Sequence, residues 1–277
     1  MSGTAVAPVA IDSFGVTDKG KVRPSNQDNF LIVAIRKSVE VSQSSLSGEA
    51  GVEYFGAAEA RLFVVADGVG GGPSGDRASA DTVTALLHYV QETAGCFHQI
   101  SAKREHELFA QLETTVRDVH QNLVASHSGG GSGPATTLTM VLLVWPRAYF
   151  IHVGDSRAYV RRAGRLQQLT RDQTLGEYMV SVGAMSEEQA AKSGPAASLT
   201  SAIGGSELSP VVGLIDLDPG DGILLCTDGL TRDVSNERIA EVLNEAGTAQ
   251  AAGEKLLAEA LAGGGKDNIT LIVVRTS

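Results

Sequence analysis

The order of predicted elements places this 277-residue chain in the α+β class, with sheets packed together and pairs of helices on the outside. Strand patterns occur in groups along the chain, and helix patterns occur in pairs instead of alternating with single strands. The sequence contains no internal repeat and no linker that would divide it. We therefore expect one domain over residues 11–277, preceded by a loosely held tail at residues 1–10.

The first part of the chain predicts strands separated by polar segments. A strand begins at Ile11, a polar turn covers residues 18–29, and a second strand covers residues 30–35. Residues 36–60 are rich in serine, glycine and glutamate in part, and they predict a surface excursion. A compact apolar strand follows at residues 62–66 and ends abruptly at an Asp-Gly pair.

Two amphipathic helices are predicted next. Their apolar residues recur at a spacing of three and four, which places them on one helix face. These residues are Val83, Leu86, Leu87 and Val90 in the first helix, and Leu108, Leu112, Val116, Val119 and Leu123 in the second. A glycine-rich run at residues 129–133 ends the second helix.

The second half of the chain returns to strands and closes with a helix pair and a last strand. The predicted strands cover residues 137–144, 148–153, 158–161, 166–169, 211–215, 223–226 and 269–274. The predicted helices lie near residues 175–182, 186–192, 236–244 and 249–261. Thr248 is the expected N-cap of the last helix.

The composition indicates an acidic globular protein. Hydrophobic residues make up 43% of the chain, and the formal net charge of −10 argues against nucleic acid or an anionic membrane as the main partner. Cys96 and Cys226 are far apart, which fits a reducing compartment and excludes a disulfide scaffold or a cysteine-built zinc site. No segment approaches the ~18 apolar residues of a membrane span, and residues 1–10 lack the features of a secretory signal. We therefore expect a cytoplasmic enzyme-sized domain.

Five aspartates lie at the boundaries of strongly apolar strands, namely Asp28, Asp67, Asp155, Asp228 and Asp267. A carboxylate in such a position is partly desolvated, and five brought together would repel one another. Divalent cations remove that conflict, and oxygen donors without interleaved His or Cys indicate magnesium or manganese instead of zinc. Any one of these residues alone is more simply a turn residue or a helix cap. The five together favour a metal site.

Short motifs in a fixed order carry a resemblance to a known family. They are Arg23-x-x-Asn26-Gln27-Asp28, Ala66-Asp67-Gly68-Val69-Gly70-Gly71, Thr136-Thr137, Val153-Gly154-Asp155-Ser156-Arg157, Leu169-Thr170-Arg171-Asp172, Thr227-Asp228-Gly229-Leu230 and Lys266-Asp267-Asn268-Ile269-Thr270. In this order they resemble the type 2C serine/threonine phosphatases, the metal-dependent protein phosphatase family, in its compact bacterial form. Each motif is weak alone, but the ordered set is specific and covers residues 11–275.

The resemblance implies two packed antiparallel sheets with helix pairs on both outer faces and a metal cleft at one end. It implies that Asp67 bridges two metal ions and that the Gly68 carbonyl completes the first. Asp228 and Asp267 would ligate the second ion. Asp28 would hold metal-bound water.

Two further roles follow from the same resemblance. Asp155, together with Asp228, matches a weaker third metal position seen in bacterial relatives. Arg23 would grip the substrate phosphate, and its planar fork suits that task because it can donate two hydrogen bonds at once. Taken alone, Arg23 is more simply a solvated turn residue.

The function implied is a Mn²⁺- or Mg²⁺-dependent phosphatase that hydrolyses phosphoserine and phosphothreonine on proteins. Its substrates would be targets of a serine/threonine kinase. A water bridging two divalent cations loses its proton near neutral pH and can attack phosphorus directly, so no phosphoenzyme is expected. The segment 171–207 corresponds to the flap beside the cleft of bacterial relatives and is the expected place of substrate choice.

The sequence departs from the family pattern where some members carry histidine. Val69 stands directly after the Asp-Gly pair, and Gly72 stands at a second position used by many bacterial relatives. The donor of the leaving-group proton is therefore unidentified, which keeps a non-catalytic phosphoprotein-binding module open as an alternative. All the expected metal carboxylates are present, which favours catalysis. A phosphatase for small phosphate esters also stays open.

Two other hypotheses arise from local motifs. The segment from Cys226 to Arg232 approaches a cysteine-phosphatase loop, but a thiol at the end of an apolar strand is usually inert, and Asp228 would hinder anion binding. We expect Arg232 to be a surface or salt-bridging residue. Residues 70–75 fit the GxGxxG pattern of dinucleotide sites, but a second helix follows where a parallel strand is needed. The six histidines, at positions 88, 98, 106, 120, 127 and 152, are expected to be structural.

Overall fold

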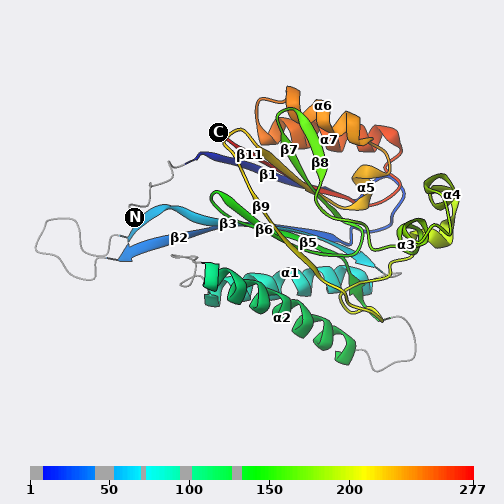
Figure 1. Cartoon of the computed structure of the whole chain (residues 1–277), viewed down its shortest axis with the longest axis horizontal. Coiled ribbons are helices and arrows are strands. Elements are labelled where there is room, and N and C mark those ends of the chain that lie inside the picture. The colour runs from blue at the N-terminus through cyan, green and yellow to red at the C-terminus, as the bar shows by residue number, and fades with distance from the viewer. Residues whose placement is uncertain (1–8, 41–52, 70–72, 94–101, 127–132) are drawn as a thin grey trace, which may run out of the picture.

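Two antiparallel sheets lie face to face in the computed structural model, with helices covering the outer face of each (Figure 1). The structure describes residues 9–40, 53–69, 73–93, 102–126 and 133–277. This arrangement confirms the predicted α+β class and the predicted layers. No helix in these described ranges is both long and apolar enough to cross a membrane.

The first sheet has the strand order β1-β11-β10-β7-β8. Its strands are β1 (Ile11–Asp18), β7 (Arg157–Arg162), β8 (Arg165–Gln168), β10 (Gly222–Cys226) and β11 (Ile269–Thr276). Strand β10 is buried along its whole length between β11 and β7, as its continuous apolar sequence requires. Leu224 and Cys226 face the helices, and Ile223 and Leu225 face the second sheet.

The second sheet has the strand order β2-β3-β5-β6-β9, with a short strand β4 paired to the end of β3. Its strands are β2 (Asp28–Glu40), β3 (Glu53–Val69), β4 (Ala135–Thr136), β5 (Leu138–Val144), β6 (Arg147–Val153) and β9 (Val211–Asp216). Phe63 and Val65 of β3 join the apolar layer between the sheets, whereas Leu62 and Val64 face the helices. Successive side chains of β3 point to opposite faces of the sheet, so the strand contributes both to the layer between the sheets and to the layer under the helices.

Two pairs of helices cover the sheets. Helices α1 (Pro73–Thr93) and α2 (Ala102–Ser126) pack on the second sheet, and α6 (Asn236–Glu245) and α7 (Ala249–Gly263) pack on the first. Of the predicted apolar stripe of α1, Val83 and Leu86 are buried, but Leu87 is exposed. The stripe of α2 is buried wherever its side chains are described. The predicted cap of α7 is confirmed, because the Thr248 hydroxyl accepts a hydrogen bond from the Ala251 N–H.

The prediction of a surface excursion over residues 36–60 is wrong at both of its ends. Residues 36–40 belong to β2 and residues 53–60 belong to β3, and the two strands pair as a long antiparallel hairpin. Figure 1 shows this hairpin reaching past β5, which pairs with β3 only over residues 61–65. Hydrogen bonds between the two strands hold both segments in extended conformation, and this pairing outweighs their weak local preference for strand structure.

The two described ends of the chain lie together. Of the predicted tail, residues 1–8 fall outside the described part. Ala10 exchanges two backbone hydrogen bonds of 3.1 Å with Ser277, which extends the pairing of β1 with β11. The glycine run that ends α2 falls largely outside the described residues.

Candidate active site

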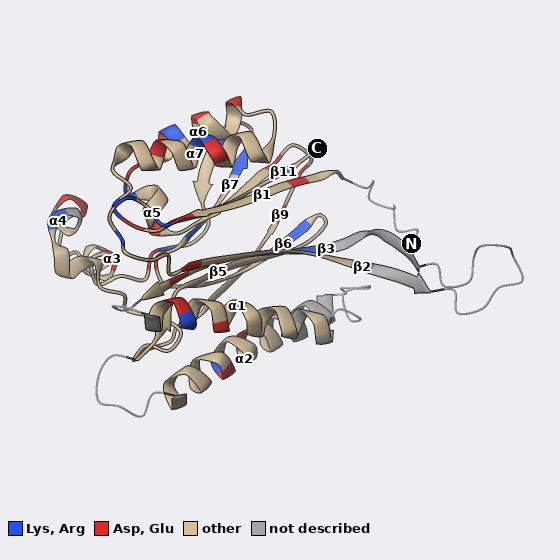
Figure 2. Ribbon diagram, turned by 180° about the vertical axis from the view of Figure 1, so that it is seen from behind, with Lys and Arg blue, Asp and Glu red and all other residues tan. Residues whose placement is uncertain are grey.

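The five aspartates singled out in the sequence lie together at one end of the two sheets. Asp28 begins β2 and stands opposite Asp67 of β3 in the strand register. Asp155 follows β6, Asp228 begins the short helix α5 (Asp228–Thr231), and Asp267 lies just before β11. Figure 2 shows acidic and basic segments together near α5, at the same end of the molecule as α3 and α4. Residues spread over the whole chain therefore meet in one place.

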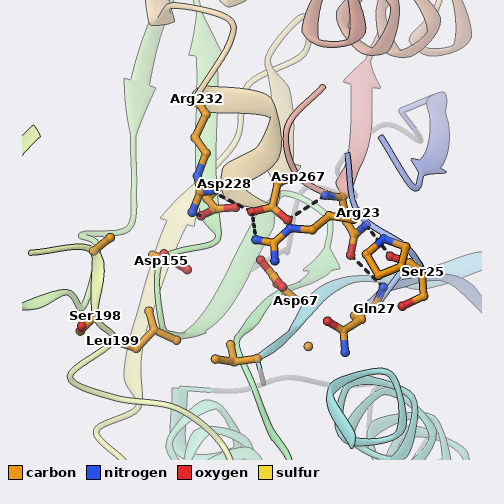
Figure 3. Close-up of a pocket in the computed structure, with 15 residues that line it drawn as sticks. Arg23, Ser25, Gln27, Asp67, Asp155, Ser198, Leu199, Asp228, Arg232 and Asp267 are labelled. Carbon is orange, nitrogen blue, oxygen red and sulfur yellow. Dashed lines mark hydrogen bonds and ion pairs between the residues drawn. The ribbon is translucent and has the colours of Figure 1, made fainter. Parts of the chain in front are cut away.

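Four of these aspartates line a cleft of about 500 Å³, and Asp28 is buried beside them. The cleft is shown in Figure 3, where Asp67, Asp155, Asp228 and Asp267 surround its centre. Residues 197–199 form part of its wall. They belong to the predicted flap, which contains α3 (Leu175–Ser181), α4 (Glu187–Lys192) and the 3-10 turn Gly194–Ala197. A neighbouring hollow of about 600 Å³ shares Asp155 and Asp228 with the cleft and extends under these flap helices.

Asp67 does not end its strand, contrary to the sequence expectation. Strand β3 continues to Val69 because Gly68 pairs with Thr136 of β4. The Asp67 N–H donates to the Thr137 hydroxyl over 3.0 Å, and its carbonyl accepts from the Thr136 hydroxyl over 2.9 Å and from the Thr137 N–H over 2.9 Å. The Thr-Thr motif thus fixes the backbone that carries Asp67.

Gly68 lies where the loop before β2 and the first turn of α1 approach the strand closely. Its N–H donates to the Gln27 carbonyl over 3.1 Å. A Cβ atom at this position would lie 2.3 Å from the carbonyl oxygen of Gly75, closer than atoms pack in proteins. Only glycine fits here without moving α1, which explains the Asp-Gly pair in the motif.

Asp28 is buried and accepts a hydrogen bond from a threonine hydroxyl. Its Oδ2 accepts a hydrogen bond of 2.9 Å from the hydroxyl of Thr227, which in turn accepts from the Thr270 N–H over 3.0 Å. Its Oδ1 is buried and has no hydrogen-bond partner among the described residues, and the same is true of Asp228 Oδ1. Burial is the main reason that the pKa of Asp28 rises to about 7.

The neighbouring carboxyl groups show the same electrostatic conflict. Burial raises the pKa of Asp67 well above its usual range, and the charges of the other four aspartates raise it further. Burial also raises the pKa of Asp155 to about 7, with Asp228 adding to the effect. The pKa of Asp228 is raised by burial although Arg232 opposes that shift. The cluster therefore carries more negative charge than its surroundings stabilise.

Two arginines compensate part of this charge. Arg23 donates from Nη2 to Asp267 Oδ2 over 2.7 Å, and Arg232 donates from Nη1 to the same oxygen over 2.8 Å. Arg232 also donates from Nη2 to Asp228 Oδ2. Figure 3 shows both guanidinium groups directed into the cleft. With the arginines in these positions, the described residues contain no group of three Asp, Glu, His or Cys side chains already arranged as metal ligands.

Arg232 lines the cleft, although the sequence predicted only a surface or salt-bridging residue. The expected salt bridge is present, but it lies inside the cleft and not on an ordinary surface. Its spacing of four residues from Asp228 was the available signal, because such residues are neighbours on a helix.

Asn268 is a second residue whose role appears only in the structure. Its side chain accepts from the Gln27 N–H over 2.9 Å and donates to the carbonyls of Lys19 and Ser25 over 2.8 and 2.9 Å. These bonds tie the loop between β1 and β2 to the start of β11. They hold Arg23 over the cleft.

The structure removes two alternative hypotheses. Burial raises the pKa of Cys226 to about 12, so its thiol is an inert part of the core and cannot serve as a nucleophile. The sheets are antiparallel, and the next described element after α1 is the helix α2 and not a parallel strand, so the described residues do not form a dinucleotide-binding fold. Residues 70–72 of that glycine run lie outside the described part.

None of the described histidines lines the cleft. His152 is buried between the Thr139 hydroxyl, 2.9 Å from Nδ1, and the Arg171 carbonyl, 3.0 Å from Nε2. Burial lowers the pKa of His152. His120 Nδ1 accepts from the Gly204 N–H over 3.1 Å, and His88 is exposed on α1. The side chains of the other three histidines are not described.

Comparison with known proteins places this cleft in context. The sequence model of the family described as Protein phosphatase 2C matches residues 51–262. The serine/threonine protein phosphatase PstP of Mycobacterium tuberculosis is 35% identical over 78% of this chain. The chain spans only 40% of that relative's length.

Solved structures share the whole architecture. The serine/threonine phosphatase of S. agalactiae superimposes with a TM-score of 0.76 and 28% identity, covering 96% of this chain and 99% of its own. The catalytic domain of PstP, solved in complex with two manganese ions, superimposes with a TM-score of 0.74 and 28% identity, covering 97% of this chain and 99% of its own.

Proposed function

The chain belongs to the protein phosphatase 2C family, and we propose that its cleft hydrolyses phosphoserine and phosphothreonine on other proteins. The observation that carries this proposal is the convergence of five aspartates on one cleft that also holds two arginines. Carboxylates are suited to divalent cations, and guanidinium groups are suited to phosphate. The serine/threonine phosphatases that resemble this chain support the substrate class.

The residues fit two manganese or magnesium ions. Two buried carboxylate oxygens, on Asp28 and Asp228, have no hydrogen-bond partner among the described residues. Burial and the neighbouring carboxylates disfavour the ionised forms of Asp28, Asp67 and Asp155, whose pKa values are raised. A cation would supply both the missing partner and the missing charge. The donors are all oxygen, which suits magnesium or manganese. The PstP catalytic domain with two manganese ions supports the same choice.

We assign the ligands residue by residue as part of this proposal. Asp67 would contact both ions, with the Gly68 carbonyl on the first, and Asp228 and Asp267 on the second. Asp28 would act through water, since it lies behind the cleft.

A weaker third position would use Asp155 together with Asp228. These two residues line both the cleft and the neighbouring hollow under the flap. Their carboxyl groups are close enough for the charge of Asp228 to raise the pKa of Asp155.

The reaction transfers the phosphoryl group to water and returns a hydroxyl to the serine or threonine. Bound divalent cations would supply an ionised water and neutralise charge on the phosphoryl oxygens. Arg23 would bind the phosphate from the loop held by Asn268. Val69 is 37% exposed on the cleft wall and has no proton to donate, so the leaving oxygen takes its proton from water or another cleft group.

The substrates would be proteins phosphorylated by a serine/threonine kinase, and the flap would choose among them. Residues 197–199 of the flap line the cleft, and α3 and α4 border the neighbouring hollow. Surface segments next to a rigid site commonly carry specificity. Two widely separated cysteines suit a reducing compartment, which supports a location in the cytoplasm.

The decisive experiment measures phosphate release from a phosphothreonine peptide with Mn²⁺ and then with EDTA. We expect EDTA to abolish the activity and Asp67→Asn to lower it at least about 100-fold. Cys226→Ser is the control and should retain activity, because the thiol is buried away from the cleft. Wild-type protein that binds Mn²⁺ but releases no phosphate would instead indicate a phosphoprotein-binding module. Activity that survives EDTA would refute the metal-dependent mechanism.

A further inference from the structure

Two guanidinium groups share a single carboxylate oxygen in the cleft. Arg23 reaches Asp267 Oδ2 from the loop before β2, and Arg232 reaches it from the end of α5. Arg23 Nη2 and Arg232 Nη1 lie 2.7 and 2.8 Å from this oxygen, so the two nitrogens are at most about 5.5 Å apart. Both arginine side chains keep nearly half of their surface exposed, at 49% and 47%. Figure 3 shows them approaching Asp267 from opposite sides.

Such an arrangement is suited to an oxyanion. Two positive groups at this separation repel each other unless a negative group lies between them. Here the Asp267 carboxylate provides that negative group. A cation bound by Asp228 and Asp267 would compete with Arg232, because the hydrogen bonds of the Arg232 guanidinium group go to the carboxylates of these two residues. Arg23 would meet the same competition at Asp267.

We infer that Arg232 is a second phosphate-binding residue, acting with Arg23 on the phosphoryl oxygens of the substrate. This inference rests on the proposed function and deepens it. Arg232 lines both the main cleft and the hollow under the flap, so its guanidinium group has open space on both sides of Asp228. Once a cation holds the two carboxylates, the arginine exchanges a carboxylate partner for a phosphate partner.

The inference has a signature that a purely structural residue would not produce. While it is paired with Asp228 and Asp267, Arg232 competes with a cation for the same oxygens. Removing its charge should therefore strengthen metal binding and weaken phosphate binding. These two effects have opposite signs. A residue that merely supports the fold would weaken both.

The test compares Arg232→Ala and Arg232→Lys with Arg238→Ala. Arg238 is the matched control, because it pairs with Glu241 and Glu259 on the helices over the first sheet. Calorimetry measures Mn²⁺ binding to each metal-free protein, and then the binding of inorganic phosphate to each Mn²⁺-loaded protein. Steady-state assays on the phosphothreonine peptide give KM and kcat.

For Arg232→Ala we expect phosphate binding to weaken about tenfold, the loss of one charge-assisted pair, with a similar rise in KM. Mn²⁺ binding should become tighter, and Arg232→Lys should lie between the variant and the wild type because it keeps the charge but not the fork. Arg238→Ala should match the wild type in both measurements. Unchanged phosphate affinity in Arg232→Ala would overturn the inference. Weaker Mn²⁺ binding in that variant would also overturn it, since Arg232 would then position the metal carboxylates.

The same data separate this inference from the proposed function. Wild-type protein that binds Mn²⁺ and phosphate without hydrolysing the peptide would refute the proposed function alone. Hydrolysis combined with an unchanged phosphate affinity in Arg232→Ala would refute the role of Arg232 alone.

Discussion

Replacing Asp28 by asparagine should change how the stability of the metal-free protein depends on pH. Burial raises the pKa of Asp28 from 3.8 to about 7 in the folded protein. Between these values the folded protein keeps a proton that the unfolded chain has lost, so the free energy of unfolding falls as pH rises. This loss of stability is absent below about pH 4 and complete above about pH 7. About three pH units at roughly 1.4 kcal/mol each give a loss of about 4 kcal/mol.

Asparagine removes this titration and keeps nearly the same shape. Its amide oxygen can still accept the hydrogen bond from Thr227. All other titrating groups are shared by the two proteins, so their difference reports the titration of Asp28 together with its effect on neighbouring carboxyl groups such as Asp67. The Asp28→Asn variant should therefore gain stability relative to the wild type, by about 4 kcal/mol between pH 4 and pH 8 in EDTA. Any cost of placing an amide beside the unpartnered Oδ1 position is the same at each pH.

Urea denaturation at several pH values measures this difference, with equal m-values as the check that both proteins unfold alike. Saturating Mn²⁺ should reduce the gap at pH 8, because a nearby cation stabilises the charged carboxylate. A stability difference that stays constant from pH 4 to pH 8 in EDTA would refute the reasoning. It would mean that Asp28 is ionised in the folded protein throughout this range.

Three further substitutions test the support of the site. Thr227→Val removes a hydroxyl that donates to the buried Asp28 carboxylate and should destabilise the protein at pH 8 by about 2 kcal/mol. An unchanged denaturation midpoint would contradict this. Gly229→Ala would place a Cβ atom 1.9 Å from the Asn268 carbonyl oxygen. We therefore expect the free energy of unfolding, measured by heat or urea, to fall by about 3 kcal/mol and Mn²⁺ binding to weaken. Normal stability would show that the start of β11 can move. Arg157→Lys replaces the two parallel hydrogen bonds from Arg157 to the Asp172 carboxylate by one, and it should lower the free energy of unfolding by about 1 kcal/mol. Equal stability of the two proteins would show that the bidentate contact contributes nothing.

Much of the site could be predicted because its signals are local. Asp155, Asp228 and Asp267 each border an apolar strand, and such a strand is recognised from a few neighbouring residues. The Asp-Gly pairs are local as well, since Gly68 and Gly229 stand where an added Cβ would meet backbone atoms. The order of the motifs then indicated the family, which the match over residues 51–262 shows.

The errors concern residues whose partners are distant in sequence. The hairpin of β2 and β3 is longer than predicted because each strand supplies the other's hydrogen bonds. Strand β3 continues past Asp67 because β4, almost 70 residues further along the chain, pairs with its end. Leu87 fits a helical stripe in the sequence and is nevertheless exposed on α1.

The sequence by itself determined the fold class, the carboxylates of the cleft and the expectation of oxygen-bound cations. These follow from residue type and short-range periodicity, which a chain carries before it folds. Only the tertiary structure decided that Asp28 is buried beside one hydroxyl, that Asn268 holds the loop of Arg23, and that Arg232 shares an oxygen of Asp267 with Arg23. Burial and charge pairing depend on which distant segments meet, and the packing of the two sheets sets those meetings.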